Sequence, residues 1–220
     1  MEARDGLNPK GRVEVLVTRG KPAVKKGRRI EIAKGVWIHE YYDVEVGSDQ
    51  LLEYIDIKNL IVNGGKSKVI TSLVAGATNP IGRMCIGDRG TIPSDPTVPK
   101  VPAETTTPIT TLYNEVYRGD IDGITVDVGT LGINEARFTK TFSALDVPVA
   151  SFSNQAKPVV NEVGLITYDP GVAALPRAPV WAPNTPSSDE KLFSIRTFKS
   201  VPFEAANEIS VTIRYTIFIE

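Results

Sequence analysis

The amino-acid sequence predicts a mainly β protein, an antiparallel β-sandwich with one short α-helix and long proline-rich loops. The first reason lies at the end of the chain, where apolar residues occupy every second position from Ile209 to Ile219. The positions between them are mostly Ser, Thr or Arg. This period of two is typical of a half-buried β-strand, so we expect the C-terminal strand to be part of the core.

The second reason is that similar runs recur along the chain. They are short and rich in Val, Ile, Thr or aromatic residues, and Gly, Pro, Asn or Asp separates most of them. In chain order, the expected strands are residues 12–18, 28–33, 36–46, 53–62, 124–129, 134–142, 159–168 and 192–198. We also expect a short strand around Cys85, with a buried thiol, because Met84 and Ile86 beside it are apolar.

One segment has the period of a helix. After an Asn-Gly-Gly turn, the run KSKVITSLVAGA places Val69, Ile70, Leu73 and Val74 at helical spacing. This pattern predicts a single helix of about three turns, which packs against a sheet through its apolar stripe.

We expect both parts of the chain to share one sandwich. Residues 1–62 are predicted to form an N-terminal β segment with a basic hairpin, and residues 63–220 to carry the helix and two proline-rich arms. The hairpin is predicted between the strands at 12–18 and 28–33, because glycine and proline residues lie between them. Its positive charges are Arg19, Lys21, Lys25, Lys26, Arg28 and Arg29. The alternative use of this cluster is contact with nucleic acid or with an acidic protein surface.

Two long stretches are too rich in proline for regular structure. Residues 90–108 and 170–186 each carry several prolines, so each is expected to run as an extended loop or arm. Stiff arms lose little entropy when they bind another surface, which makes subunit contact a plausible use. Trp181 lies in the second arm, where its ring either folds back onto its own sheet or anchors in a neighbouring chain.

Composition excludes several classes of protein. A formal net charge of −1 argues against a general nucleic-acid binder, and the single cysteine excludes an intramolecular disulfide and a Cys-based zinc site. The N-terminus lacks the apolar stretch of a secretion signal, and no run approaches the roughly 20 apolar residues that span a bilayer. We expect a soluble product that is made in the cytoplasm.

The search for catalytic residues finds weak candidates. His39 is the only histidine and lies in a predicted strand, where a structural role is expected. The run Gly64-Gly65-Lys66-Ser67 ends like a phosphate-binding loop, but Leu60 occupies the position where that motif needs glycine.

A group of aspartates is the last candidate for chemistry. Asp120, Asp122 and Asp127 offer oxygen ligands, but their spacing matches no calcium loop, and we expect turn residues there. No catalytic, cofactor-binding or metal-binding residue is therefore predicted, and the protein is not expected to be an enzyme.

The order of several phrases resembles a known family. The chain runs through NLIVNGGKSKVITSLVAG, MCIGDRGTIPSDP, TLYNEVYRGDI, VVNEVGLI and SIRTFKS to the alternating last strand. This order is similar to that of tailed-bacteriophage virion proteins of the tail-fibre and tail-collar group, over about residues 60–220. The most specific matches are Leu112, Glu115, Val116 and Arg118, then Asn161, Glu162, Gly164 and Leu165, then Arg196 and Phe198. Arg89 before Gly90 is a small departure from the glycine-rich turn of the group.

The resemblance implies a structural component of a virion, in the tail, the collar with its fibre attachment, or the head decoration. It carries no shared active site. The expected partners are other copies of the chain and neighbouring virion proteins, in a symmetric oligomer, with a host surface as a further candidate. We expect two ion pairs, Glu115 with Arg118 and Glu162 with Arg196, to fix strand or subunit register.

The alternative function is a β-sandwich module that binds a host glycan or surface protein through its long loops. Sugar rings stack on aromatic side chains, and the candidates for such contacts are Trp37, Tyr41, Tyr42 and Trp181.

Overall fold

The fold is known from a computed structural model. It describes residues 9–27, 29–33, 36–39, 42–58, 60–61, 65, 80–102, 109–128, 134–172, 175–181 and 189–219. The helix predicted after the Asn-Gly-Gly turn lies outside the described residues.

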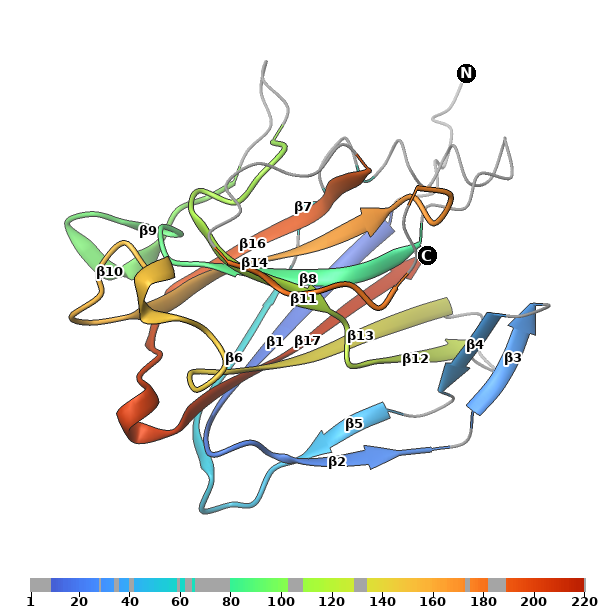
Figure 1. Ribbon diagram of the computed structural model, residues 1–220, viewed down its shortest axis with the longest axis horizontal. Coiled ribbons are helices and arrows are strands. Elements are labelled where there is room, and N and C mark those ends of the chain that lie inside the picture. The colour runs from blue at the N-terminus through green and yellow to red at the C-terminus, as the bar shows by residue number, and fades with distance from the viewer. Residues whose placement is uncertain are drawn as a thin grey trace, which may run out of the picture.

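Two antiparallel sheets face each other in a sandwich, as the sequence predicts (Figure 1). The five-stranded sheet has the order β12-β13-β17-β1-β6. Its strands are β1 (Pro9–Arg19), β6 (Leu51–Lys58), β12 (Gly123–Val128), β13 (Asn134–Ser143) and β17 (Ile209–Ile219). The six-stranded sheet has the order β15-β11-β8-β14-β16-β7. Its strands are β7 (Leu60–Ile61), β8 (Ile81–Gly87), β11 (Glu115–Asp120), β14 (Val159–Tyr168), β15 (Val180–Trp181) and β16 (Glu190–Pro202).

Three two-stranded sheets complete the β structure of the described residues. They pair β2 (Ala23–Lys26) with β5 (Tyr42–Glu45), β3 (Arg29–Ala33) with β4 (Val36–His39), and β9 (Thr91–Ile92) with β10 (Asp95–Pro99). Two short 3-10 helices, η1 (Val149–Ser151) and η2 (Ala205–Asn207), lie in connections. In the part of the chain described above, no helix is long and apolar enough to cross a membrane.

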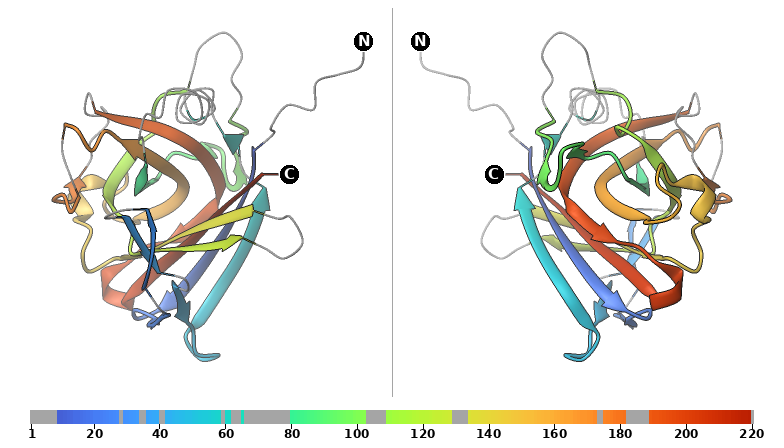
Figure 2. Two further views of the ribbon diagram at one scale, coloured as in Figure 1. Left: turned by 90° about the vertical axis from the view of Figure 1, so that its right-hand side faces the viewer. Right: turned by 90° about the vertical axis from the view of Figure 1, so that its left-hand side faces the viewer.

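The C-terminal strand lies in the middle of its sheet. β17 pairs along its length with β13 on one side and β1 on the other (Figure 2). Its apolar face is buried as predicted, with Ile213 and Tyr215 both at 0% exposure, but the polar face is covered too, and Thr212 is also at 0%. The reason is that the two-stranded sheet of β2 and β5 packs there: Arg214 Nε donates to Asp43 Oδ1 at 2.7 Å. The strand is therefore more than half-buried.

The inner faces of the two sheets form the main core. Tyr215, Phe142 and Phe198 are among its largest fully buried side chains. Tyr117 meets Phe142 edge-on, with ring centroids 5.9 Å apart. The core therefore joins β11 of one sheet to β13 of the other.

The outer face of the six-stranded sheet carries a second apolar cluster. It consists of Cys85, Leu112, Ile166, Leu192 and Ile195. Cys85 is fully buried in β8, which confirms the expected buried thiol, and burial raises its pKa well above the ordinary value. Strands β8 and β14 are thus covered on both faces.

The predicted basic hairpin is wrong. β1 pairs with β17 and β6, whereas the run at residues 28–33 forms β3 and pairs with β4. Both edges of β1 are occupied, so that run has no edge of β1 to join. β2 lies between them in the chain and pairs with β5.

The boundaries of several other elements differ from the prediction. The run at 36–46 is divided into β4 and β5, and the run at 53–62 into β6 and β7. Both proline-rich stretches contain strands: β9 and β10 lie in the first and β15 in the second. Short strands and edge strands tolerate proline because few of their backbone N–H groups must donate hydrogen bonds to a neighbouring strand.

Candidate functional site

An irregularity in β11 places two residues of the recognised motif on one face. The register opposite β8 shifts between Glu115 and Tyr117, so Val116 is an extra residue in the strand. In a regular strand, residues three apart point to opposite faces. Here Arg118 Nε and Nη2 donate to the two carboxylate oxygens of Glu115 at 2.7 and 2.9 Å. The predicted pair is confirmed.

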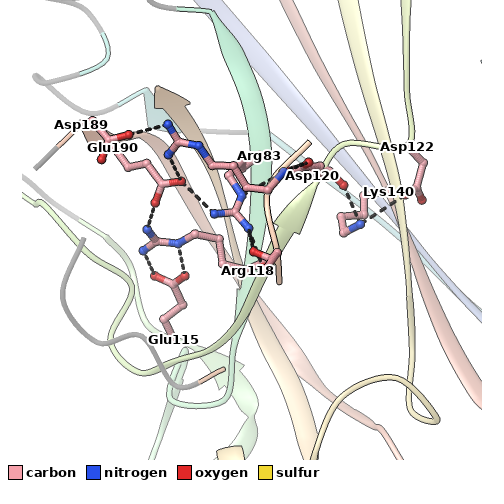
Figure 3. Close-up of polar contacts among 10 residues, drawn as sticks. Arg83, Glu115, Arg118, Asp120, Asp122, Lys140, Asp189 and Glu190 are labelled. Carbon is pink, nitrogen blue, oxygen red and sulfur yellow. Dashed lines mark hydrogen bonds and ion pairs between the residues drawn. The ribbon is translucent and has the colours of Figure 1, made fainter. Parts of the chain in front are cut away.

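A buried carboxylate lies at the centre of the surrounding network (Figure 3). Glu190 Oε1 accepts from Arg83 Nη1 at 2.9 Å and from Arg177 Nη1 at 3.1 Å, while Oε2 accepts from Arg118 Nη1. We call Arg83, Glu115, Arg118, Arg177 and Glu190 the Glu190 cluster. Three strands of the sheet and the segment before β15 contribute to it.

The pKa values in this cluster reflect a balance of burial and charge. Burial on its own raises the pKa of Glu190, but the hydrogen bonds and charges of Arg83 and Arg118 outweigh it and hold that pKa below its ordinary value. The pKa of Glu115 is raised, because burial outweighs the effect of Arg118. A carboxylate with several guanidinium partners thus remains ionised in a buried place.

The cluster attaches the second proline-containing segment to the sheet. Arg83 Nη2 donates to the carbonyl oxygen of Ala178 at 2.8 Å, and the backbone N–H of Arg177 donates to Asp120 Oδ2 at 2.9 Å. Asp120 also forms an ion pair with Arg83, Nε to Oδ1, at 3.0 Å. These contacts explain why an irregular segment lies along β11.

Trp181 ends this attached segment. Its backbone pairs with Tyr117 of β11. Its side chain remains 53% exposed. The segment thus folds back onto its own sheet, while much of the indole ring stays accessible.

A second buried carboxylate is bound in a different way. Glu162 Oε1 accepts from the backbone N–H groups of Asn114 at 2.8 Å and Arg89 at 3.1 Å, and Oε2 accepts from that of Tyr113 at 2.8 Å. Together with Asn161 and Gly90 we call these residues the Glu162 cluster. One side chain of β14 therefore joins the loops that follow β8 and precede β11.

The predicted pair of Glu162 with Arg196 is wrong. The register of β14 and β16 places Thr197 opposite Glu162 and Arg196 opposite Val163. Because neighbouring residues of a strand point to opposite faces, Glu162 and Arg196 lie on different sides of the sheet. Burial lowers the pKa of Arg196 from its ordinary value.

Asn161 extends the Glu162 cluster. Its Oδ1 accepts from the backbone N–H of Gly90 at 2.6 Å, and its Nδ2 donates to the carbonyl oxygen of Asp88 and to Ser200 Oγ. A Cβ on Gly90 would lie 2.3 Å from the carbonyl oxygen of Asn161. The loop therefore needs glycine at this position so that the two backbones can approach.

The hydrogen-bond donors to the Glu162 carboxylate are backbone N–H groups, which carry partial positive charges and not full ones. Burial raises the pKa of Glu162 to about 7, although the three backbone N–H groups favour the charged form. The negative charge of Asp88 acts in the same direction as burial. Glu162 therefore changes its charge near neutral pH.

The other candidates from the sequence lie in strands, bind neighbouring residues, or fall outside the residues that the structure describes. His39 pairs with Arg29 in the β3–β4 hairpin. Asp122 binds Lys140 at 3.2 Å and the backbone N–H of Thr141 at 2.6 Å. Asp127 lies in β12. Of the phosphate-loop candidate, only Gly65 is described.

No three His, Cys, Asp or Glu residues within the described ranges are grouped so that they could hold a metal ion. The carboxylate oxygens of Glu162 and Glu190 are occupied by protein donors.

A hollow of about 440 Å³ lies next to the ion pair of Asp122 and Lys140. Tyr117 contributes to its lining, and Lys21 Nζ and Asp146 Oδ2 form an exposed ion pair beside it at 2.7 Å. Lys21 is the member of the basic cluster that contributes to this hollow.

Sequence reasoning missed Arg83, Arg177 and Glu190. The signal was present for Arg83, which is a charged residue inside the apolar run IGRMCIG. Such a residue needs a partner when the strand is buried. For Arg177 and Glu190 no local pattern indicated burial.

Comparisons of the chain with models of known families, with curated proteins and with solved structures found no match.

Proposed function

We propose that this protein is a structural component of a tailed-bacteriophage virion, in the tail, the collar with its fibre attachment, or the head decoration. It acts by oligomeric assembly, with other copies of itself and neighbouring virion proteins as partners. The proposal begins from the order of sequence motifs over residues 60–220.

One observation of the structure supports it most. The polar motif residues Glu115, Arg118, Asn161 and Glu162 are all buried. Glu115 and Arg118 bind each other within β11 and Arg118 also binds Glu190 of β16, while Asn161 and Glu162 bind the loops beside β8 and β11. They therefore join strands of one sheet and attach loops to the sandwich. Residues used in this way maintain a frame of fixed shape, which is what a building block of a particle needs.

The test is the composition of purified particles. Particles from a phage that carries this gene are separated on a density gradient, and the chain is quantified by mass spectrometry against known capsid and tail proteins. We expect a fixed copy number per particle that withstands repeated purification. A chain that is absent from particles and stays in the supernatant as a monomer would overturn the proposal.

A second candidate function is a glycan-binding module, and the half-exposed ring of Trp181 favours it. Binding to a glycan array by the monomer, lost in Trp181→Ala and retained in Val172→Ala, would support this function. Val172 is a suitable control because its side chain is 65% exposed in the same proline-containing stretch.

A further inference from the structure

One edge of the five-stranded sheet is built unlike the other sheet edges. β6 is eight residues long, and β1 is its sole pairing partner among the described strands. The edges of the six-stranded sheet are β15 and β7, with two residues each, and β12 at the opposite edge lies against β4 and β5. Short or covered edges prevent pairing with other chains, so among the described strands of the two sheets β6 is the edge left open to it.

The side chains of β6 are unusually apolar for an open edge. Leu51, Leu52 and Tyr54 are 41%, 48% and 47% exposed. The strand contains neither proline nor glycine that would discourage pairing. In Figure 2 it forms the outermost strand beside β1.

The acidic residues of β6 are already bound within the chain. Asp56 accepts from Arg12 Nε at 2.8 Å and from Arg12 Nη2 at 2.6 Å. Glu53 forms an ion pair with Lys199 of β16. Free charges normally protect an edge strand from pairing, and here each of the two carboxylates has a positive partner within its own chain.

We propose that a second copy of this chain adds its β6 to this edge in antiparallel orientation, so that two five-stranded sheets join across a two-fold axis. This inference rests on the proposed assembly function and deepens it, since it names the surface where copies meet. A two-fold contact uses the same patch on both copies and closes on itself.

The side chains favour one register. Residues that face each other across the axis must share a face, and a centre at Tyr54 places the two Tyr54 rings together and Leu51 opposite Ile57 of the second copy. Aromatic and apolar pairs of this kind stabilise cross-strand contacts. A centre at Asp56 would place two carboxylates together. In the favoured register Leu52 lies opposite Asp56.

The backbone contribution is large enough for a specific contact. An antiparallel pair forms about one hydrogen bond per residue, and in the favoured register residues 51–57 of the two copies face each other, so they supply about seven hydrogen bonds. A typical interface has about ten. The edge therefore supplies the hydrogen bonds of an interface of ordinary size.

A cross-linking experiment tests the register directly. Cross-strand partners have Cβ atoms about 5 Å apart, which is near disulfide distance, so the full-length Tyr54→Cys variant is expected to form a disulfide-linked dimer under mild oxidation. The control is Val24→Cys, whose position on β2 is 51% exposed. The native Cys85 is buried and does not compete. We expect the dimer at least tenfold faster for Tyr54→Cys; equal rates would overturn the proposal.

A pair of charge variants at one exposed position provides the second test. Leu52→Glu would bring a carboxylate next to Asp56 of the second copy, whereas Leu52→Lys would bring an ammonium group. Sedimentation equilibrium is expected to show at least tenfold weaker dimerisation for the Glu variant, and a change within threefold for the Lys variant. Equal effects of the two variants, or a monomeric wild-type chain at millimolar concentration, would overturn the proposal.

The particle analysis separates the two levels of inference. A chain that is present in particles but forms no Tyr54→Cys dimer would refute the β6 contact and leave the proposed function intact. A chain that dimerises through β6 but never enters particles would refute the proposed function and leave the contact intact.

Discussion

Glu162 and Glu190 lie towards opposite ends of neighbouring strands and are equally buried, at 0% and 2% exposure. Their partners differ in kind: guanidinium groups surround Glu190, and backbone N–H groups surround Glu162. The pKa of Glu190 is accordingly held below its ordinary value, while that of Glu162 rises to about 7. Burial penalises both charges, and full positive charges offset that penalty where dipoles do not.

The comparison separates two ways of attaching a loop to a sheet. The Glu190 cluster holds the segment before β15 through charges that persist across the neutral range. The Glu162 cluster holds the loops beside β8 and β11 through a carboxylate that gains a proton in that range. Removing an arginine from the Glu190 cluster should therefore lower stability, whereas protonating Glu162 should raise it.

The largest effect is expected from Arg118→Met. This change leaves Glu115 and Glu190 buried without one of their guanidinium partners, and breaking a buried ion pair costs about 3–5 kcal/mol. Urea denaturation followed by fluorescence measures the free energy of unfolding. A loss below about 1 kcal/mol would contradict the compensation of these carboxylates by arginine.

The second prediction concerns pH. The folded pKa of Glu162, about 7, lies above its ordinary value of 4.5, so the folded state holds the proton more tightly. Stabilisation from this proton is complete below pH 4.5 and is lost as the pH rises through about 7. The difference corresponds to about 3 kcal/mol.

The matched variant for this prediction is Glu162→Gln, which cannot titrate. The free energy of unfolding is measured at pH 5 and at pH 8.5 for both proteins. An ordinary histidine titrates in this interval, and both proteins keep His39, so the difference between the wild type and the variant is the readout. Identical pH dependence of the two proteins would contradict a raised pKa at Glu162.

A smaller effect is expected from Gly90→Ala. The added Cβ would lie 2.3 Å from a backbone oxygen that has little room to move, and overpacking of this kind costs about 1–3 kcal/mol. Gly171→Ala is the control, because its Cβ would approach only the flexible carboxylate of Asp169. Thermal unfolding of both variants measures the effect. An equal fall in melting temperature for the two variants would argue against the close approach of Gly90 to Asn161.

The smallest effect is expected from Lys21→Ala. This change removes an ion pair with Asp146 in which the two side chains are 57% and 55% exposed. Exposed pairs contribute about 0–1 kcal/mol, so the denaturation midpoint should hardly move. A loss of stability as large as that of Arg118→Met would contradict the expectation that exposed ion pairs stabilise this fold less than buried ones.

The fold class follows from the sequence because alternation survives in β1, β13 and β17. Pairing does not follow from it, since β1 could join any free edge with the same pattern. The predicted hairpin failed for that reason: residues 28–33 alternate well, but β17 and β6 occupy both edges of β1.

The candidate site was predictable in part. Glu115 and Arg118 were paired from their motif, yet the extra residue Val116 that makes the pair possible leaves no local signal. Glu162 was identified but given the wrong partner, because its donors are backbone groups of distant loops and backbone groups are not distinguishable in sequence. Arg177 and Glu190 come together only through the tertiary fold.

The most direct measurement of the central contrast is a carbon-13 NMR titration of the glutamate carboxyl groups, with assignments from Glu162→Gln and Glu190→Gln. We predict a resonance from Glu162 that titrates near pH 7 and one from Glu190 that titrates below pH 4.5. Titration of both groups at the same pH would contradict the conclusion that arginine charges, and not burial, distinguish Glu190 from Glu162.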